Sequence, residues 1–137
     1  VLHPGARSSG IAGNETSLVL RLVWRGVGLA LLPGDAEQQA IESVLRGGRD
    51  LDCSVLVLPH HGSRSSLHPG LYRRVGASWA VAACGPGNRF GFPHPEVVRE
   101  CVASGATVMT TAEHGAIRFV WREPQEMRIE TARTRMH

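Results

Sequence analysis

The chain has 137 residues, a net charge of +3 and 42% hydrophobic residues, a composition typical of one globular domain and not of a disordered segment. No apolar run approaches the ~20 residues that a membrane-spanning helix needs, and no signal-peptide pattern occurs. All 15 basic residues are arginines spread along the chain, so the charge gives only weak support for nucleic-acid binding.

The first half of the chain predicts a loop, two strands and a helix. Residues 1–13 are rich in Gly and Ser and predict a loop that starts without methionine, so we expect a piece of a longer protein. The apolar segments 18–24 and 27–32 predict hairpin strands joined by a tight turn at Arg25-Gly26. Neither segment alternates cleanly, which favours burial of both faces. A helix is predicted over residues 36–45.

The second half alternates strands and helices. Strands are predicted at 55–58, 79–83, 107–111 and 116–121, and helices at 71–75 and 96–103. The whole order, ββαβαβαββ, predicts an α/β fold with a mixed, largely parallel sheet and flanking helices. Residues 125–137 form either a charged tail or a last edge strand. The three cysteines contain no Cys-x-x-Cys pair and are interpreted as small buried hydrophobic residues.

Two successive strands end in residues that can bind a metal ion. Asp35 follows the strand at 27–32, and His60 and His61 follow the strand at 55–58. Ligands bind outside the carboxyl ends of such strands, and carboxylate and imidazole groups are ligands for zinc or manganese. The alternative for Asp35 is an N-cap of the following helix, in a capping box with Gln38, and the two roles do not exclude each other. The alternative for the histidines is an exposed polar turn.

The residues after the histidine pair are candidate contacts for a phosphate. Ser63, Arg64 and Ser65 can donate hydrogen bonds to one. The alternative is a solvated turn in which Ser66 caps the next helix, and we favour it slightly.

A long glycine-rich and aromatic loop, residues 84–95, precedes the helix at 96–103. Asn88 is either a turn residue or a substrate contact. His94 is either a neighbour of the helix start, or a general acid or substrate ligand. Phe90 and Phe92 can stack on a nucleobase, although packing within the loop is the favoured interpretation.

The ordered set of motifs resembles the metallo-β-lactamase-like domain of ComEC competence proteins. The segments that carry the resemblance are Leu31-Leu-Pro-Gly-Asp35, Leu58-Pro-His-His-Gly-Ser63, Asn88-Arg-Phe-Gly91 and His94-Pro95, with support from Leu2-His-Pro4 and 14–20. The similarity runs from Val1 to Trp121. Two departures stand out: Pro33 replaces the usual Thr, and the loop is two residues longer between Gly91 and His94, with Phe90 for Tyr.

The resemblance implies a fold that is half of an αββα sandwich. Residues 1–124 are expected to form the C-terminal part of the metallo-β-lactamase-like domain, because the His-x-His-x-Asp-His motif of its N-terminal half is not found here. We expect that missing half to be a partner within the same domain. Without it, an apolar face is expected at Leu18, Leu20, Leu22 and Val81.

The resemblance also implies a metal-dependent phosphodiesterase or nuclease in DNA uptake. Two divalent ions, zinc or manganese, would be bridged by Asp35 and held by His60 and His61. His94 would assist the leaving oxygen, which makes Asp35 and His94 the candidate catalytic residues. Asn14 stands where related enzymes carry another histidine, and it joins the candidate substrate contacts, which are otherwise Ser63, Arg64, Ser65 and Asn88.

The expected partners are DNA, as a single strand or as the strand that does not enter the cell, and the membrane channel portion of the parent protein. The domain is expected to be soluble, on the extracytoplasmic side of the inner membrane, without lipid contact of its own. Two alternatives stay open: a catalytically incomplete binding or structural module, and a metallo-hydrolase of another phosphoester.

Overall fold

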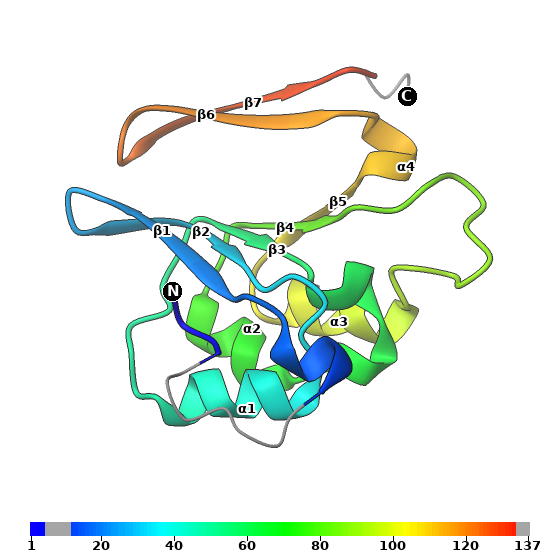
Figure 1. The fold of residues 1–137 in the computed structure, drawn as a ribbon. Helices are drawn as coiled ribbons and strands as arrows, with labels where there is room; N and C mark the ends of the chain where they lie inside the picture. Colours follow the sequence, from blue (N-terminus) through cyan, green and yellow to red (C-terminus); the bar gives the residue numbers. More distant parts are fainter. Residues whose placement is uncertain (5–11, 134–137) are drawn as a thin grey trace.

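A computed structural model describes residues 1–4 and 12–133, so most of the loop predicted at 1–13 and the end of the predicted tail lie outside the described residues. A layer of helices, a five-stranded sheet and a two-stranded hairpin stack on one another (Figure 1). The sheet strands, in spatial order, are β1 (Leu20–Trp24), β2 (Val27–Leu32), β3 (Val55–Val57), β4 (Trp79–Ala82) and β5 (Thr107–Thr110). The hairpin consists of β6 (Ile117–Glu123) and β7 (Glu126–Thr131).

Three helices connect the parallel strands, α1 (Gln38–Arg46), α2 (Pro69–Val75) and α3 (Pro95–Ala103), and the short α4 (Thr111–His114) connects β5 to the hairpin. Three 3-10 turns accompany them, η1 (Gly13–Thr16), η2 (Pro59–Gly62) and η3 (Arg64–Ser66). β1 pairs antiparallel with β2, and β2 to β5 run parallel. The predicted α/β class with a mixed sheet and flanking helices is therefore confirmed.

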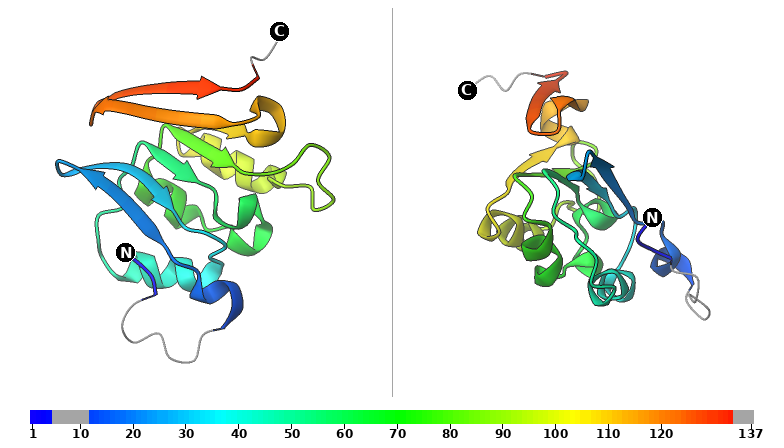
Figure 2. Two further views of the ribbon diagram at one scale, coloured as in Figure 1. Left: turned by 45° about the horizontal axis from the view of Figure 1, so that its top comes forward. Right: turned by 90° about the vertical axis from the view of Figure 1, so that its left-hand side faces the viewer.

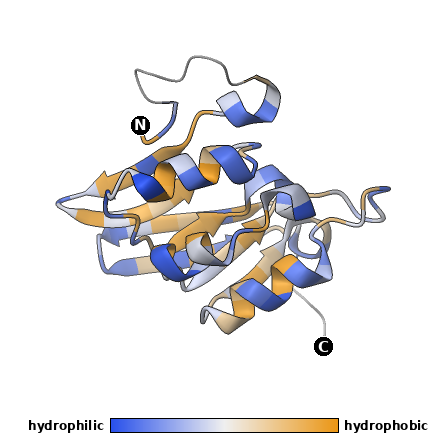
Figure 3. Cartoon of the chain, turned by 90° about the horizontal axis from the view of Figure 1, so that it is seen from below, coloured by the Kyte–Doolittle hydropathy of each residue, from blue (hydrophilic) through white to orange (hydrophobic). Residues whose placement is uncertain are grey.

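The main core lies between the sheet and helices α1, α2 and α3. Helix α1 turns Ala40, Ile41 and Val44 toward it, at the i, i+1 and i+4 positions of one helix face. Seen from the helix side, the helices carry both hydrophilic and hydrophobic residues, while the strands behind them are largely hydrophobic (Figure 3). This face of the sheet is thus closed by the chain itself.

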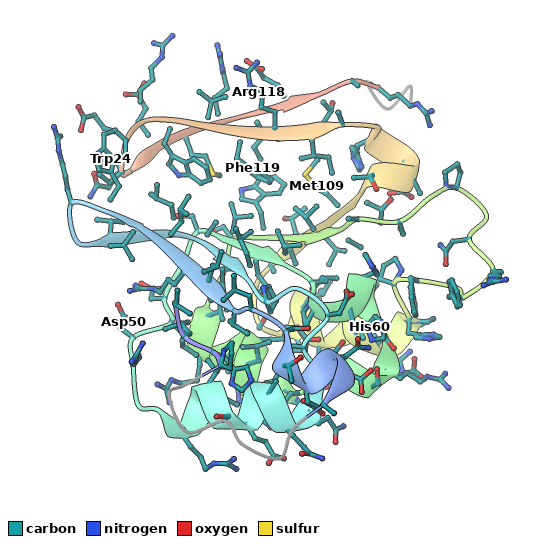
Figure 4. The ribbon with its side chains drawn as sticks, in the orientation of Figure 1. Trp24, Asp50, His60, Met109, Arg118 and Phe119 are labelled. Atoms are coloured by element: carbon teal, nitrogen blue, oxygen red, sulfur yellow. The ribbon has the colours of Figure 1, made fainter. Side chains whose placement is uncertain are left out.

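The other face of the sheet is covered by the β6–β7 hairpin (Figures 1 and 2). Phe119 points from the hairpin toward the sheet while Arg118 points away from it (Figure 4). Phe119 and Trp121 pack against a small cluster centred on Val81, which is only 7% exposed. The expectation that Val81 lies on an uncovered face is therefore wrong, because the hairpin returns over it.

Strand β1, at the edge of the sheet, keeps an exposed apolar surface. Leu18 and Leu22 are 52% and 48% exposed, as expected, whereas Leu20 is partly buried. The prediction that both hairpin strands are buried on two faces holds for β2 and is wrong for β1, whose Leu22 and Val23 are about half exposed. Just before β1, Val19 pairs with His3 through an antiparallel bridge. All helices in the described ranges fall short of the length and apolarity that a membrane span requires.

Candidate functional site

The carboxyl ends of β2 and β3 meet at one edge of the sheet. The two strands are parallel neighbours, with Ala30 opposite Val55 and Leu31 opposite Leu56. Just beyond them, the backbone N–H of His60 donates to the carbonyl of Gly34 at 2.9 Å. This bond ties the two strand exits together, so the residues after each strand become neighbours.

Asp35 and His61 face each other across this junction. The distance from Asp35 Oδ1 to His61 Nε2 is 3.5 Å, and both side chains are about half exposed. The alternative interpretation, in which Asp35 caps the helix, is wrong. Helix α1 begins at Gln38, and its first N–H groups donate instead to the carboxylate of Glu15, which lies 2.6 Å from Ala40 N. The Asp35 carboxylate is thus free of the helix and open to a ligand.

His60 belongs to a second cluster, centred on Glu37. His60 Nδ1 lies 3.2 Å from Glu37 Oε1, which also accepts hydrogen bonds from Asn14 Nδ2 and Ser65 Oγ, each at 3.1 Å. The hydrogen bond from Asn14, followed by those from Ser65 and His60, lowers the pKa of Glu37 against the opposing effect of burial. Because a carboxylate only accepts, this contact favours hydrogen on Nδ1 and leaves Nε2 of His60 as a lone-pair donor.

The turn that carries both histidines is strained. His60 and His61 have φ of 47° and 59°, a left-handed conformation that costs L-residues ~1–2 kcal/mol each. The buried hydroxyl of Ser66 holds the turn from below, with its Oγ 2.8 Å from the carbonyl oxygens of Pro59 and Ser63. Ser66 therefore does not cap α2, whose N-cap is His68. Such strain is typical of functional sites, where surrounding contacts enforce it.

The candidate phosphate contacts after the turn are already engaged. Ser63 Oγ accepts from Ser65 N and so caps η3. Arg64 forms an ion pair with Glu96 at 2.8 Å. The carboxylate of Glu96 accepts hydrogen bonds from its own backbone N–H and from Arg64, and these lower its pKa. A phosphate would have to exchange with these partners, so the roles of Ser63, Arg64 and Ser65 in substrate binding stay predictions.

The long loop between β4 and α3 closes over the same edge and protrudes from the molecule (Figure 1). Asn88 organises it: its amide donates to the carbonyl of Phe92, and its carbonyl accepts from Phe92 N, both at 2.9 Å. The ring of Phe92 stacks on His61 and meets His94 edge-on, with centroids 6.3 and 5.5 Å apart. The backbone N–H of His94 donates to the carbonyl of Gly62, which joins the loop to the histidine turn.

An open cavity of about 510 Å³ lies between this loop and the strand ends, a size typical of ligand sites. Its polar lining comes from Asp35, His60, His61 and Asn88, and its apolar lining includes Phe90 and Phe92. His94 and Asn14 are not among the lining residues. The structure thus brings the predicted metal ligands and Asn88 to the cavity, whereas five other predicted site residues do not line it: Asn14, Ser63, Arg64, Ser65 and His94.

The donor set fits part of a metal site. In a tetrahedral site with ligand distances of ~2.0–2.2 Å, two donors are about 3.4 Å apart, close to the separation of Asp35 Oδ1 and His61 Nε2. A ligating histidine usually gives its other ring N–H to a carboxylate, as His60 does toward Glu37. Within residues 1–4 and 12–133, however, no group of three or more His, Cys, Asp or Glu side chains is arranged to hold an ion. The chain therefore offers ligands, and not a complete centre.

Sequence reasoning missed Glu37 and Glu15. Both were treated as ordinary helix or loop residues, yet one carboxylate backs His60 and the other binds the start of α1. The spacing Asp35-x-Glu37 at a strand exit was the available signal for the first. No local signal identified the second, because its partners lie about 25 residues away.

Comparison with known proteins finds distant relatives that are named as competence or recombination proteins. The chain is 35% identical to competence protein ComA of Neisseria gonorrhoeae over 119 residues, and 32% identical to recombination protein 2 of Haemophilus influenzae over 124. It is 27% identical to ComE operon protein 3 of Bacillus subtilis over 106 residues. These alignments cover 86%, 90% and 77% of the chain.

The chain spans less than a fifth of each of these relatives, between 14% and 17% of their length. No protein-family model matches it, and no solved structure matches it significantly. Distant homology to bacterial competence proteins is therefore established, in agreement with the resemblance of the sequence motifs.

Proposed function

We propose that this chain carries part of the active site of a metal-dependent phosphodiesterase in a ComEC-type DNA-uptake protein. The observation that supports it most is the pairing of Asp35 with His61 at 3.5 Å, beside a His60 that is backed by a carboxylate. The names of the relatives support DNA uptake as the setting.

Each residue has a role in this proposal. Asp35 and His61 would hold a divalent zinc or manganese ion, and Asp35 would bridge to a second ion held by His60 Nε2. When bound, such ions lower the pKa of water and neutralise charge on the phosphate. Glu37 orients His60 by accepting from Nδ1. His94 would assist the leaving oxygen; it does not itself line the cavity, but its ring meets the cavity-lining Phe92 edge-on.

The remaining ligands would come from sequence that the relatives carry outside the matched region. We propose a His-x-His-x-Asp-His half-domain there, which would complete the αββα sandwich. The substrate would be DNA, as a single strand or as the strand that does not enter the cell. The domain would lie on the extracytoplasmic side of the inner membrane, next to the channel portion of the parent protein.

A second candidate is a binding module without hydrolytic activity. The observation that favours it is the incomplete donor set among the residues of the described ranges. A metallo-hydrolase of another phosphoester, such as a phosphocholine ester, uses the same ligands and differs only in substrate.

Metal binding tests the proposal directly. Titration with Mn²⁺ followed by electron paramagnetic resonance, and with Zn²⁺ by calorimetry, should give binding that Asp35→Asn and His61→Ala each abolish. Asp52→Asn is the matched control, since Asp52 is exposed and precedes β3 at the opposite end of that strand. Equal metal binding by Asp35→Asn and Asp52→Asn would refute the site.

Hydrolysis separates the candidate functions. DNA, bis-p-nitrophenyl phosphate and a phosphocholine ester would be incubated with the chain and with the Asp35→Asn variant, in the presence of Mn²⁺ or Zn²⁺. We expect feeble cleavage by the 137-residue chain and Asp35-dependent cleavage once the proposed N-terminal half is supplied. Metal binding without any cleavage in the complemented domain would favour the binding module.

A further inference from the structure

The loop between β4 and α3 carries a row of aromatic rings beside the cavity. The centroids of Phe90 and Phe92 are 5.3 Å apart with 17° between the ring planes, and Phe92 is in turn stacked on His61 at 22°. The guanidinium of Arg89 lies 4.8 Å from the centroid of Phe90. The rings therefore lead from the tip of the loop to the histidine turn in nearly parallel planes.

Packing alone does not explain Phe90. Its side chain is 57% exposed, although it lines the cavity together with Phe92. The loop is held by the hydrogen bonds between the Asn88 side chain and the backbone of Phe92, and by the bond from His94 N to Gly62 O, and neither involves the ring of Phe90. An exposed ring at the mouth of a cavity contributes little to stability, and it is available to a ligand with a flat face.

We propose that Phe90 and Arg89 form a stacking platform for one unpaired nucleobase, which places the neighbouring phosphate in the cavity toward Asp35 and the histidine pair. Aromatic rings and guanidinium planes are the groups on which single-stranded nucleic acids stack their bases. The positive charge of Arg89 favours the polyanionic strand. The platform would be the base-binding part of the proposed phosphodiesterase site, and the proposal rests on that function because DNA is its substrate.

The platform selects unpaired bases without reading their identity. Every base has a π-face, so stacking tolerates sequence, whereas a base inside a duplex would have to leave its neighbours first. The ring row would then fix the register of a single strand relative to Asp35. Phe92 contributes to this register because it continues the stack from Phe90 to His61.

The test compares ligands that differ only in their bases. Fluorescence anisotropy would measure the affinity of the chain for labelled octathymidylate and for an octamer of abasic sites with the same phosphates. Phe90→Ala removes the exposed ring, and Val102→Ala is the control, since Val102 is 59% exposed on α3 and does not line the cavity. Thymidine monophosphate, followed by nuclear magnetic resonance shifts of Gly91 and Phe92, tests whether a free nucleotide occupies the same platform.

We expect Phe90→Ala to weaken octathymidylate binding by about 5- to 140-fold, the range for loss of one stacked base, and to leave binding of the abasic octamer unchanged. If thymidine monophosphate also binds and its binding depends on Phe90, the platform is supported, and it accepts the base of a free nucleotide as well as that of a strand. Equal loss for both octamers, or no loss at all, overturns the proposal. No step of this test uses metal or cleavage, so the two proposals fail separately. An inactive Asp35 site would refute the phosphodiesterase and leave the platform standing. Loss of the platform would leave the phosphodiesterase standing.

Discussion

At Gly62 the histidine turn lies directly against Pro93 of the aromatic loop. Gly62 is buried, its φ is 88°, and a Cβ added there would lie 2.6 Å from Cβ and 3.0 Å from Cα of Pro93. Gly62→Ala therefore has two costs: the left-handed backbone and the collision with Pro93. The collision is not relieved by a rotamer change, because the atoms belong to a proline ring and its backbone.

Gly87→Ala measures the backbone cost without the collision. Gly87 lies in the same loop with φ of 63°, and a Cβ there would meet nothing within 4 Å. We expect this control to lose ~1–2 kcal/mol of unfolding free energy from backbone strain alone. Overpacking typically adds ~1–3 kcal/mol, so Gly62→Ala should lose about 2–5 kcal/mol.

Urea unfolding of the three proteins, with intrinsic tryptophan fluorescence as the signal, measures both differences. Movement of Pro93 would also carry Phe92 off His61, so the ring-current shifts of the His61 imidazole protons should change in Gly62→Ala only. A loss of stability in Gly62→Ala no larger than in Gly87→Ala would show that the loop does not pack on the turn in this way.

Two further predictions concern buried groups. Ser66→Ala removes the hydroxyl under the histidine turn, which donates to the carbonyl oxygens of Pro59 and Ser63, while Ser63 O keeps its bond from Ser66 N; the change should lose ~1–3 kcal/mol in urea unfolding. The exposed Ser43→Ala on α1 should stay within about 0.5 kcal/mol, and equal effects of the two changes would contradict the proposed support. Burial raises the pKa of the Cys101 thiol to about 12, so maleimide at pH 8 should spare it in the folded chain; mass spectrometry showing native labelling of Cys101 would contradict its burial.

The local pattern of the sequence determined the elements and the strand exits. β2 was predicted with its observed bounds, and Asp35 and the histidine pair were expected at one sheet edge. The elements follow from apolar periodicity, which acts over a few residues. The meeting of the strand exits follows from the rule that successive parallel strands joined by a helix usually lie side by side, whatever residues fill the connection. The resemblance to competence proteins was also readable from sequence, and the distant homology to them agrees with it.

Only the tertiary structure decided which polar groups meet. The carboxylate that binds the start of α1 comes from Glu15 and not from Asp35, and Ser66 supports a turn instead of capping a helix. Val81 is buried because a hairpin about 40 residues later returns over the sheet. Such pairings depend on contacts between segments far apart in the chain, where loop closure and packing choose the partner, and no local propensity specifies them.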